Sequence, residues 1–227
     1  MIAQPVAARF AHVDTWVFDL DNTLYPFGCP LWPQIDARIT VFVMNLFGID
    51  GLSARALQKY YYERYGTSLS GLMAEQDIAH APFMDFVHDI DRTSLLPNPP
   101  LAAAIAALPG RKLVFTNGSR NHALQTTRQL GIDHLFEDMF DVVAAGMAPK
   151  PEALAFERFF AAHNVEPSRA AMFEDISKNL VVPHARGMAT VLVTEPGLPA
   201  PAAQSHVDFT TPDLEMFLAG LATGLEI

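Results

Sequence analysis

The sequence predicts an α/β protein whose core is a Rossmann-like, doubly wound parallel sheet, with a helical module inserted near its amino terminus. Short apolar runs alternate with helical segments along most of the chain, which is typical of parallel strands joined by helical crossovers. Residues 31–86 instead show helical periodicity and little sign of a strand. Pro97, Pro99 and Pro100 mark the return from this insert, because consecutive prolines cannot continue a helix.

The composition is that of an acidic globular chain. Its 227 residues are 50% hydrophobic and carry a formal net charge of −10, enough apolar material for one full α/β domain and a small accessory domain. The acidic balance argues against a nucleic-acid partner, because nucleic-acid binders present a basic face. No membrane partner is expected either, because no span of about 20 apolar residues is free of proline and charge.

The single cysteine and the amino-terminal segment indicate a cytoplasmic location. Cys29 alone cannot form an internal disulfide and suits a reducing compartment. It is expected to be structural rather than a catalytic thiol, because no histidine is positioned beside it. Residues 1–12 lack the continuous apolar core of a secretory signal.

The first predicted strand, Trp16 to Phe18, ends in two aspartates one residue apart, Asp19 and Asp21. Because side chains alternate along an extended strand, both carboxylates can point to the same side. Two carboxylates held near a buried sheet repel each other unless a shared proton or a cation relieves them, and a divalent metal with oxygen ligands is the natural relief. The alternative is a pair of solvated loop aspartates, since short motifs recur by chance.

The insert is predicted to contain helices with many aromatic residues. A first helix is expected to end at Gly48, and a second to be capped by Ser53 and to end at Gly66. The tyrosines at positions 60–62 are expected mainly to pack, because adjacent helix positions point to different faces. His80 and His88 are expected on polar helix surfaces, because neither lies at ligand spacing from a second metal ligand.

After the prolines, the sequence predicts a helix over residues 101–108 and then four further strands. These strands are Lys112 to Phe115, Asp141 to Ala145, Ala170 to Phe173, and Thr190 to Val193. A helix from Asn121 to Leu130 carries His122 on its outer face, and Pro151 is expected in the first turn of a later helix. Right-handed crossovers between parallel strands place helices on both faces of the sheet.

Polar residues follow four of these apolar runs, and ligands bind at the carboxyl ends of the strands in open parallel sheets. They are Asp19 and Asp21, Thr116 and Asn117, Lys150, and Glu174 with Asp175. Each of these four groups, taken alone, also occurs in ordinary turns. Their joint occurrence in this order predicts a single site.

The stretch Asp19-Leu20-Asp21-Asn22-Thr23-Leu24-Tyr25-Pro26 resembles the first motif of the haloacid dehalogenase (HAD) superfamily of phosphohydrolases. Thr116, Lys150, and Glu174-Asp175 with Asn179 match its other three motifs. The fourth departs slightly, since many relatives carry two aspartates followed by serine. Asn22, Tyr25-Pro26 and the insert segments 61–66, 69–72 and 86–91 are similar to the pyrimidine 5′-nucleotidase branch.

The resemblance implies a catalytic core of residues 1–26 and 97–227 and a helical cap of residues 27–96. It also implies an Mg²⁺-dependent phosphomonoester hydrolase with an aspartyl-phosphate intermediate. In that scheme Asp19 is the nucleophile and Asp21 the general acid and base. The phosphate would be bound by Thr116, Asn117 and Lys150, and the metal by Asp19, the Asp21 carbonyl and Asp175, with Glu174 as an additional candidate.

The expected substrate is a pyrimidine nucleoside monophosphate of the UMP or CMP type. Another small phosphoester, such as phosphoglycolate or a sugar phosphate, is the alternative, because the core motifs do not separate them. Asp21 disfavours a dehalogenase, and the filled motif positions disfavour a non-catalytic phospholigand-binding relative. The cap aromatics, Tyr60 to Tyr65 with Phe83 and Phe86, are expected to help select the substrate. The oligomeric state stays open.

Overall fold

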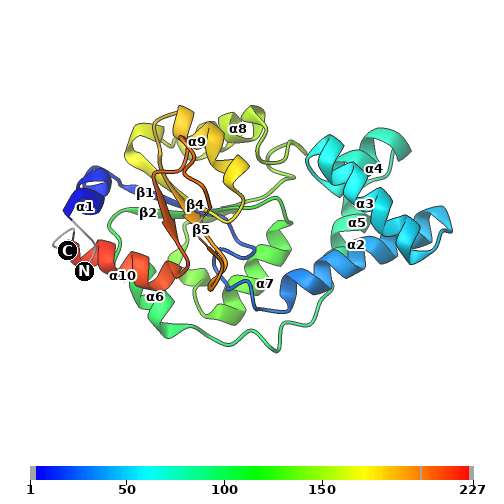
Figure 1. Cartoon of the computed structure of the whole chain (residues 1–227), viewed down its shortest axis with the longest axis horizontal. Coiled ribbons are helices and arrows are strands. Elements are labelled where there is room, and N and C mark those ends of the chain that lie inside the picture. The colour runs from blue at the N-terminus through cyan, green and yellow to red at the C-terminus, as the bar shows by residue number, and fades with distance from the viewer. Residues whose placement is uncertain (1–3, 200, 225–227) are drawn as a thin grey trace.

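The computed structural model describes residues 4–199 and 201–224, and its centre is a six-stranded parallel sheet (Figure 1). The strand order is β3-β2-β1-β4-β5-β6, so the first strand of the chain lies inside the sheet. All neighbouring strands are parallel. The predicted fold class is therefore confirmed. The strands are β1 (Thr15–Phe18), β2 (Arg111–Phe115), β3 (Asp138–Phe140), β4 (Ala170–Glu174), β5 (Ala189–Val193) and β6 (Phe209–Thr211).

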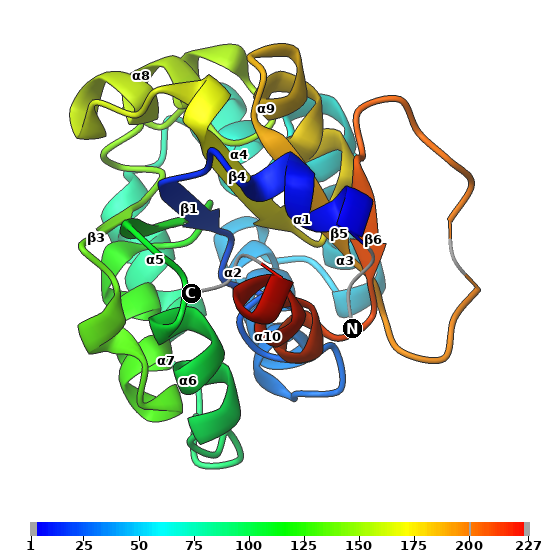
Figure 2. The same ribbon diagram turned by 90° about the vertical axis from the view of Figure 1, so that its left-hand side faces the viewer.

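Helices cover both faces of the sheet, as Figure 2 shows in a view along its edge. Alternation along β1 explains the two layers, because Trp16 and Phe18 belong to one apolar cluster and Val17 to the other. The first cluster holds side chains of α1 (Gln4–Phe10), α6 (Pro99–Ala106), α7 (Arg120–Leu130) and α10 (Leu214–Gly224). The second holds those of α8 (Ala153–His163) and lies on the side of α9 (Val181–Ala185).

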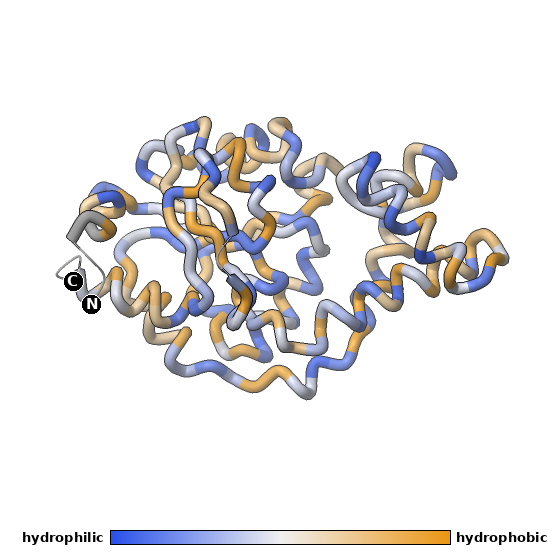
Figure 3. The backbone as a smooth tube through the Cα atoms, in the orientation of Figure 1, coloured by the Kyte–Doolittle hydropathy of each residue, from blue (hydrophilic) through white to orange (hydrophobic). Residues whose placement is uncertain are grey.

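Four helices fill the insert and lie at one end of the sheet (Figure 1). They are α2 (Leu31–Phe47), α3 (Gly51–Tyr65), α4 (Ser68–Gln76) and α5 (His80–His88). Hydrophobic and hydrophilic residues alternate along them (Figure 3), as expected for helices with one buried face. Their buried residues form a third apolar cluster around Val43, Tyr61 and Leu72. The helical cap is thus present, whereas the boundaries at residues 26/27 and 96/97 stay a prediction.

The third strand differs from the sequence prediction. β3 covers residues 138–140, and the predicted strand from Asp141 to Ala145 is a turn. The Asp141 carboxylate accepts hydrogen bonds from the backbone amides of Arg120, at 2.8 Å, and Ala144, at 2.8 Å. Because this side chain accepts the Ala144 amide three residues on, it folds the apolar run that follows into a turn, and its bond to the Arg120 amide ties that turn to the start of α7.

Two helix starts also differ from the prediction. Asp50 rather than Ser53 caps α3, because its carboxylate accepts the amides of Leu52 and Ser53. Pro151 precedes α8, which begins at Ala153. The predicted helix ends are correct at Gly48, where φ is 65°, and at Gly66, where φ is 83°.

None of the helices in the described ranges combines the length and the apolar character needed to cross a bilayer.

Candidate active site

The carboxyl ends of β1, β2 and β4 meet at one edge of the sheet, beneath the cap. The register aligns these ends, since Phe18 of β1 pairs with Val114 of β2 and with Phe173 of β4. The residues that follow or end the strands therefore lie side by side, as the sequence analysis predicted. They are Asp19, Thr116 and Glu174, and Lys150 reaches the same point from the loop before α8.

Lys150 is the cation at the centre of this edge. Its side chain is 1% exposed, and Nζ donates to Asp19 Oδ1 at 2.7 Å and to the Phe115 carbonyl at 2.7 Å. Nζ also lies 3.5 Å from Glu174 Oε1. Burial favours the neutral amine, but Asp19 and Glu174 raise the pKa of Lys150 above its ordinary value. The ammonium group is therefore charged at neutral pH and can offset the charge of a bound phosphate.

Three carboxylates form a site that fits a divalent cation. Asp19, Glu174 and Asp175 each offer an oxygen atom, and these atoms lie within 4.8 Å of one another. Burial raises the pKa of all three groups, that of Asp175 to about 7, and repulsion from Asp19 adds to the shift in Glu174 and Asp175. Glu174 Oε2 is buried without a hydrogen-bond partner among the described residues. Oxygen ligands of this kind suit Mg²⁺, whose charge would relieve the repulsion.

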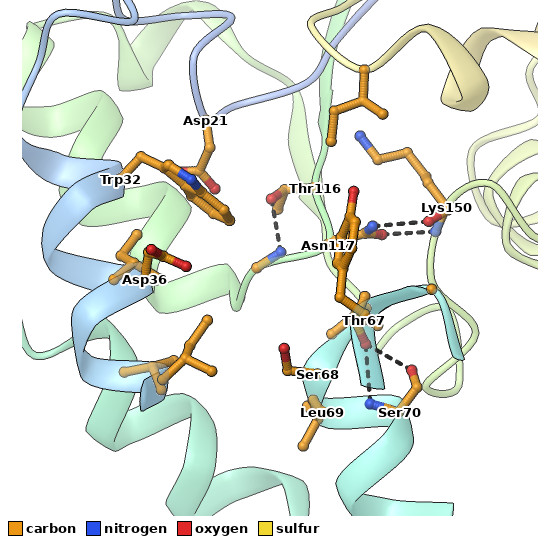
Figure 4. A pocket seen from close by; sticks show the side chains of 18 of the residues that line it. Asp21, Trp32, Asp36, Thr67, Ser68, Leu69, Ser70, Thr116, Asn117 and Lys150 are labelled. Atoms are coloured by element: carbon orange, nitrogen blue, oxygen red, sulfur yellow. Dashed lines mark hydrogen bonds between the residues drawn. The ribbon is translucent and has the colours of Figure 1, made fainter. Parts of the chain in front are cut away.

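Thr116 and Asn117 have different surroundings. The Thr116 hydroxyl oxygen accepts the Gly118 amide at 2.9 Å, which leaves its proton to donate to a ligand. The Asn117 side chain makes two hydrogen bonds to the backbone of Lys150 (Figure 4): Oδ1 accepts from the Lys150 amide at 2.7 Å, and Nδ2 donates to the Lys150 carbonyl at 3.0 Å. Asn117 therefore positions Lys150, and its predicted role as a phosphate ligand stays a prediction.

Asp21 is surrounded by residues that the sequence analysis did not assign to the site. The Tyr25 hydroxyl donates to Asp21 Oδ1 at 2.5 Å, and His122 Nε2 lies 2.8 Å from the same oxygen. His122 is fully buried, so its predicted position on the outer face of a helix is wrong. Burial alone would raise the pKa of Asp21, but the contact with His122 and the hydrogen bond from Tyr25 hold it below its ordinary value.

His88, at the end of α5, is partly buried and faces the site rather than the polar surface of its helix. Its ring stacks on that of His122 with centroids 4.4 Å apart and an interplanar angle of 8°, and its Nδ1 lies 3.1 Å from Ser119 Oγ. Burial lowers the pKa of His88 to about 3, so the ring is neutral at physiological pH. Helical spacing offered a signal, because His88 comes four residues after the buried Met84.

A cavity of about 440 Å³ separates this edge from the cap. Figure 4 shows Trp32 and Asp36 of α2 facing it from one side and Thr67 to Ser70 facing it from the other. Of the cap aromatics expected to select the substrate, Tyr62 and Phe83 line the cavity, whereas Tyr61 is buried in the cap cluster. Trp32 was missed by the sequence analysis.

Comparison with known proteins assigns the family. A model of haloacid dehalogenase-like hydrolases matches residues 13–180. This chain therefore belongs to the haloacid dehalogenase-like hydrolases.

Two relatives of known name support this assignment. Phosphate metabolism protein 8 of Saccharomyces cerevisiae is 30% identical over 130 residues, which are 53% of this chain and 40% of the relative. Enolase-phosphatase E1 of Frankia alni is 34% identical over 99 residues, which are 42% of this chain and 41% of the relative. The matched part thus spans about two fifths of each relative. Neither name refers to a pyrimidine nucleotidase, so that finer assignment is a proposal.

Solved structures share the fold at low sequence identity. A HAD phosphatase from Thermococcus onnurineus has a TM-score of 0.61 and 16% identity, covering 90% of this chain and 96% of that one. A magnesium-bound HAD hydrolase from Bacillus subtilis has a TM-score of 0.59 and 15% identity, with 92% and 98% covered. The L-2-haloacid dehalogenase of Xanthobacter autotrophicus has a TM-score of 0.55 and 16% identity, with 91% and 97% covered. The fold therefore does not separate phosphatases from dehalogenases.

Proposed function

We propose that this hydrolase is an Mg²⁺-dependent phosphomonoesterase that acts on nucleoside monophosphates, with pyrimidine nucleotides preferred. The observation that carries the proposal is one cavity with two chemically different ends. At the sheet, Lys150 and three carboxylates suit a phosphate and a metal ion. At the cap, Trp32 and Asp36 offer an aromatic surface and a hydrogen-bond acceptor for a nucleoside.

Asp19 is the nucleophile in this proposal. Lys150 binds its Oδ1, which leaves Oδ2 to attack phosphorus and form an aspartyl-phosphate. Lys150 and the Thr116 hydroxyl would bind phosphate oxygens as charge develops on them. When bound by Asp19, Asp175, Glu174 and the Asp21 carbonyl, Mg²⁺ would supply further charge neutralisation.

Asp21 favours a phosphatase over a dehalogenase. A nucleoside leaves as an alkoxide that needs a proton, whereas a halide leaves as a stable anion without one. Asp21 would protonate the leaving oxygen and then remove a proton from the hydrolytic water, which attacks the aspartyl-phosphate and releases inorganic phosphate.

Asp36 favours a leaving group that carries hydroxyl or N–H groups. Its Oδ1 accepts from Gln58 Nε2 at 2.8 Å and pairs with Arg55 at 2.5 Å. Gln58 is itself fixed, because its Oε1 accepts the Thr40 hydroxyl at 2.6 Å. Both side-chain contacts of Asp36 fall on Oδ1, which leaves Oδ2 to accept from a ribose or a base. Arg55 offsets the charge of Asp36 and also lines the cavity, so Asp36 acts there as a hydrogen-bond acceptor. Phosphoglycolate has neither a ribose nor a base to donate to it, so Asp36 favours a nucleotide over phosphoglycolate.

The aromatic lining favours a nucleotide over a sugar phosphate. Trp32 and Tyr62 are each 41% exposed and line the cavity. Lys178 Nζ lies 4.4 Å from the centroid of the Tyr62 ring, so Tyr62 has one face for stacking, and Trp32 is the main aromatic surface. Stacking of a base on an aromatic side chain contributes about 1 to 3 kcal/mol. The cavity volume of about 440 Å³ lies within the range of about 300 to 1,000 Å³ common for small-ligand sites.

A substrate panel tests the proposal. Phosphate release with Mg²⁺ should be fastest for UMP and CMP, slower for ribose 5-phosphate and slowest for phosphoglycolate. Trp32→Leu and Tyr62→Leu should lower the preference for UMP over ribose 5-phosphate about tenfold or more. Asp36→Asn should reduce the discrimination against phosphoglycolate, whereas Asp85→Asn on an exposed cap position should not. An unchanged ranking in the Trp32 and Tyr62 variants would favour the sugar-phosphate alternative.

A further inference from the structure

Two donors hold the Asp21 carboxylate by the same oxygen. The Tyr25 hydroxyl and His122 Nε2 lie 2.5 Å and 2.8 Å from Oδ1. Both donor residues are buried, with Tyr25 1% and His122 0% exposed. Two bonds to one oxygen fix the rotation of the carboxylate and leave Oδ2 as the oxygen that can exchange a proton.

Arg92 determines which nitrogen of His122 carries the proton. Arg92 Nη2 lies 2.9 Å from His122 Nδ1. A guanidinium can only donate hydrogen bonds, so Nδ1 must accept and the proton must reside on Nε2. His122 is therefore an Nε2–H donor aimed at Asp21. A doubly protonated ring would bring a second N–H against the Arg92 donor.

Further contacts hold both the ring and the arginine. His88 stacks on the His122 ring, with centroids 4.4 Å apart. Arg92 lies on the segment that returns from the cap, and its Nη2 also donates to the His88 carbonyl at 3.1 Å. The orientation of His122 thus depends on the last residue of the cap helices and on the segment that follows it.

We infer that His122 is a positioning residue that holds Asp21 Oδ2 toward the leaving-group oxygen, with its donor tautomer fixed by Arg92. The inference rests on the proposed phosphatase function of Asp21. His122 itself does not touch the substrate in this arrangement. A misplaced catalytic group can cost about 10²-fold in rate, so the contact has a measurable consequence.

The test uses two esters that differ in their need for a proton. UMP loses an alkoxide, whereas p-nitrophenyl phosphate loses a stable phenolate that hardly needs one. In single-turnover experiments with Mg²⁺, His122→Leu should slow phosphoryl transfer from UMP about 10²-fold and that from p-nitrophenyl phosphate much less. His122→Gln, which can offer an N–H to Asp21, should recover much of the UMP rate. Thr127→Val, at another fully buried position of α7, should leave the ratio of the two rates unchanged.

A spectroscopic measurement tests the hydrogen bonds without relying on activity. In ¹⁵N spectra of imidazole-labelled protein, His122 should show a protonated Nε2 and an unprotonated Nδ1, and Arg92→Met should mix the two tautomers. A protonated Nδ1 in the wild type would overturn the inference. So would equal loss on both esters in His122→Leu without recovery in His122→Gln. If the wild type releases phosphate from neither ester, the proposed function fails instead.

Discussion

Lys150 combines the contacts on which the charge balance of the site depends. It binds the proposed nucleophile, lies beside Glu174 and is held by Asn117 through its backbone. The desolvation of a buried ammonium group is offset only while these anions remain close. Asp19 and Asp21, by contrast, have different partners, since Asp19 contacts Lys150 and Asp21 contacts His122 and Tyr25. Their different surroundings imply different roles.

Substitution of each aspartate should separate those roles. Asp19→Asn removes the attacking anion and a metal-ligand charge, so no phosphoenzyme should form. Asp21→Asn keeps the backbone carbonyl and should slow both half-reactions on alkyl esters by roughly 10² to 10⁴. The loss should be smaller for p-nitrophenyl phosphate, although slow dephosphorylation limits the recovery. Burst and steady-state rates on both esters check this, and a phosphoenzyme trapped on Asp19→Asn would contradict it.

The motif residues of the site were predictable and its histidines were not. Asp19, Thr116 and Glu174 follow or end buried apolar runs, so local pattern alone brings them to one sheet edge. The burial of His122 depends instead on which face of α7 meets the sheet. That face includes Thr126 and Thr127, whose hydroxyl side chains do not contribute to an apolar pattern in the sequence.

Packing between the cap helices α3 and α4 depends on a glycine. A Cβ at Gly71 would lie 2.4 Å from Tyr61 Cδ1, closer than real Cβ contacts allow. Because the buried Tyr61 ring belongs to the cap cluster, it has little room to move.

Gly71→Ala should therefore destabilise the protein by about 1 to 3 kcal/mol. The matched control is Gly51→Ala at the start of α3, where the nearest atom to an added Cβ is 3.7 Å away. Thermal unfolding of both variants gives the comparison. An equal melting temperature for Gly71→Ala and the wild type would show that the two helices can separate without cost.

The junction between α5 and α7 should make stability depend on pH. Unfolded His88 binds a proton near its ordinary pKa of 6.5, whereas in the folded state its pKa is about 3. The unfolded state thus binds more protons below pH 6.5, so stability falls as the pH falls. For this residue the loss between pH 7.5 and 5.5 is about 1.4 kcal/mol.

Chemical denaturation at the two pH values measures this loss. His88→Phe, which keeps a ring for stacking on His122, should reduce the pH dependence by about that amount, whereas His134→Asn at an exposed position should not. An identical pH dependence in His88→Phe and the wild type would contradict the assignment.

The sequence predicted strands correctly where they contain an apolar run, and helix ends correctly where a glycine follows the helix. β1, β2, β4 and β5 each contain a short apolar run, and the ends of α2 and α3 carry glycines. The prediction failed at β3, where Asp141 accepts the amides of Ala144 and of the distant Arg120, and it missed β6 and α10. β6 covers three residues, Phe209 to Thr211, and pairs only at the sheet edge, so its signal is short.

At the scale of the whole molecule, the fold gathers three carboxylates where a metal ion would bind. The chain has a formal net charge of −10, and the cluster of Asp19, Glu174 and Asp175 is buried or partly buried. Lys150 contacts part of this charge, and the raised pKa of Asp175, about 7, reflects burial and then the repulsion from Asp19. Folding thus brings together groups that a divalent cation would stabilise.

Removal of metal should therefore affect both activity and stability. EDTA should abolish phosphatase activity and added Mg²⁺ should restore it. Because the ion binds only the folded site, Mg²⁺ at about 100 times its dissociation constant should add about 2.7 kcal/mol to the free energy of unfolding. Asp175→Asn should weaken this stabilisation, as measured by thermal unfolding with and without Mg²⁺. Full activity in EDTA would exclude the metal assignment.

The two-ended cavity also determines how an inhibitor could discriminate among related enzymes. A phosphate mimic that contacts Lys150 and the acidic cluster would act on any protein with the same strand ends, because that end reflects the shared chemistry. Groups that reach Trp32, Asp36 and the start of α4 would meet features of the cap (Figure 4). Potency would come from the sheet end of such a compound, and selectivity from the end that enters the cap.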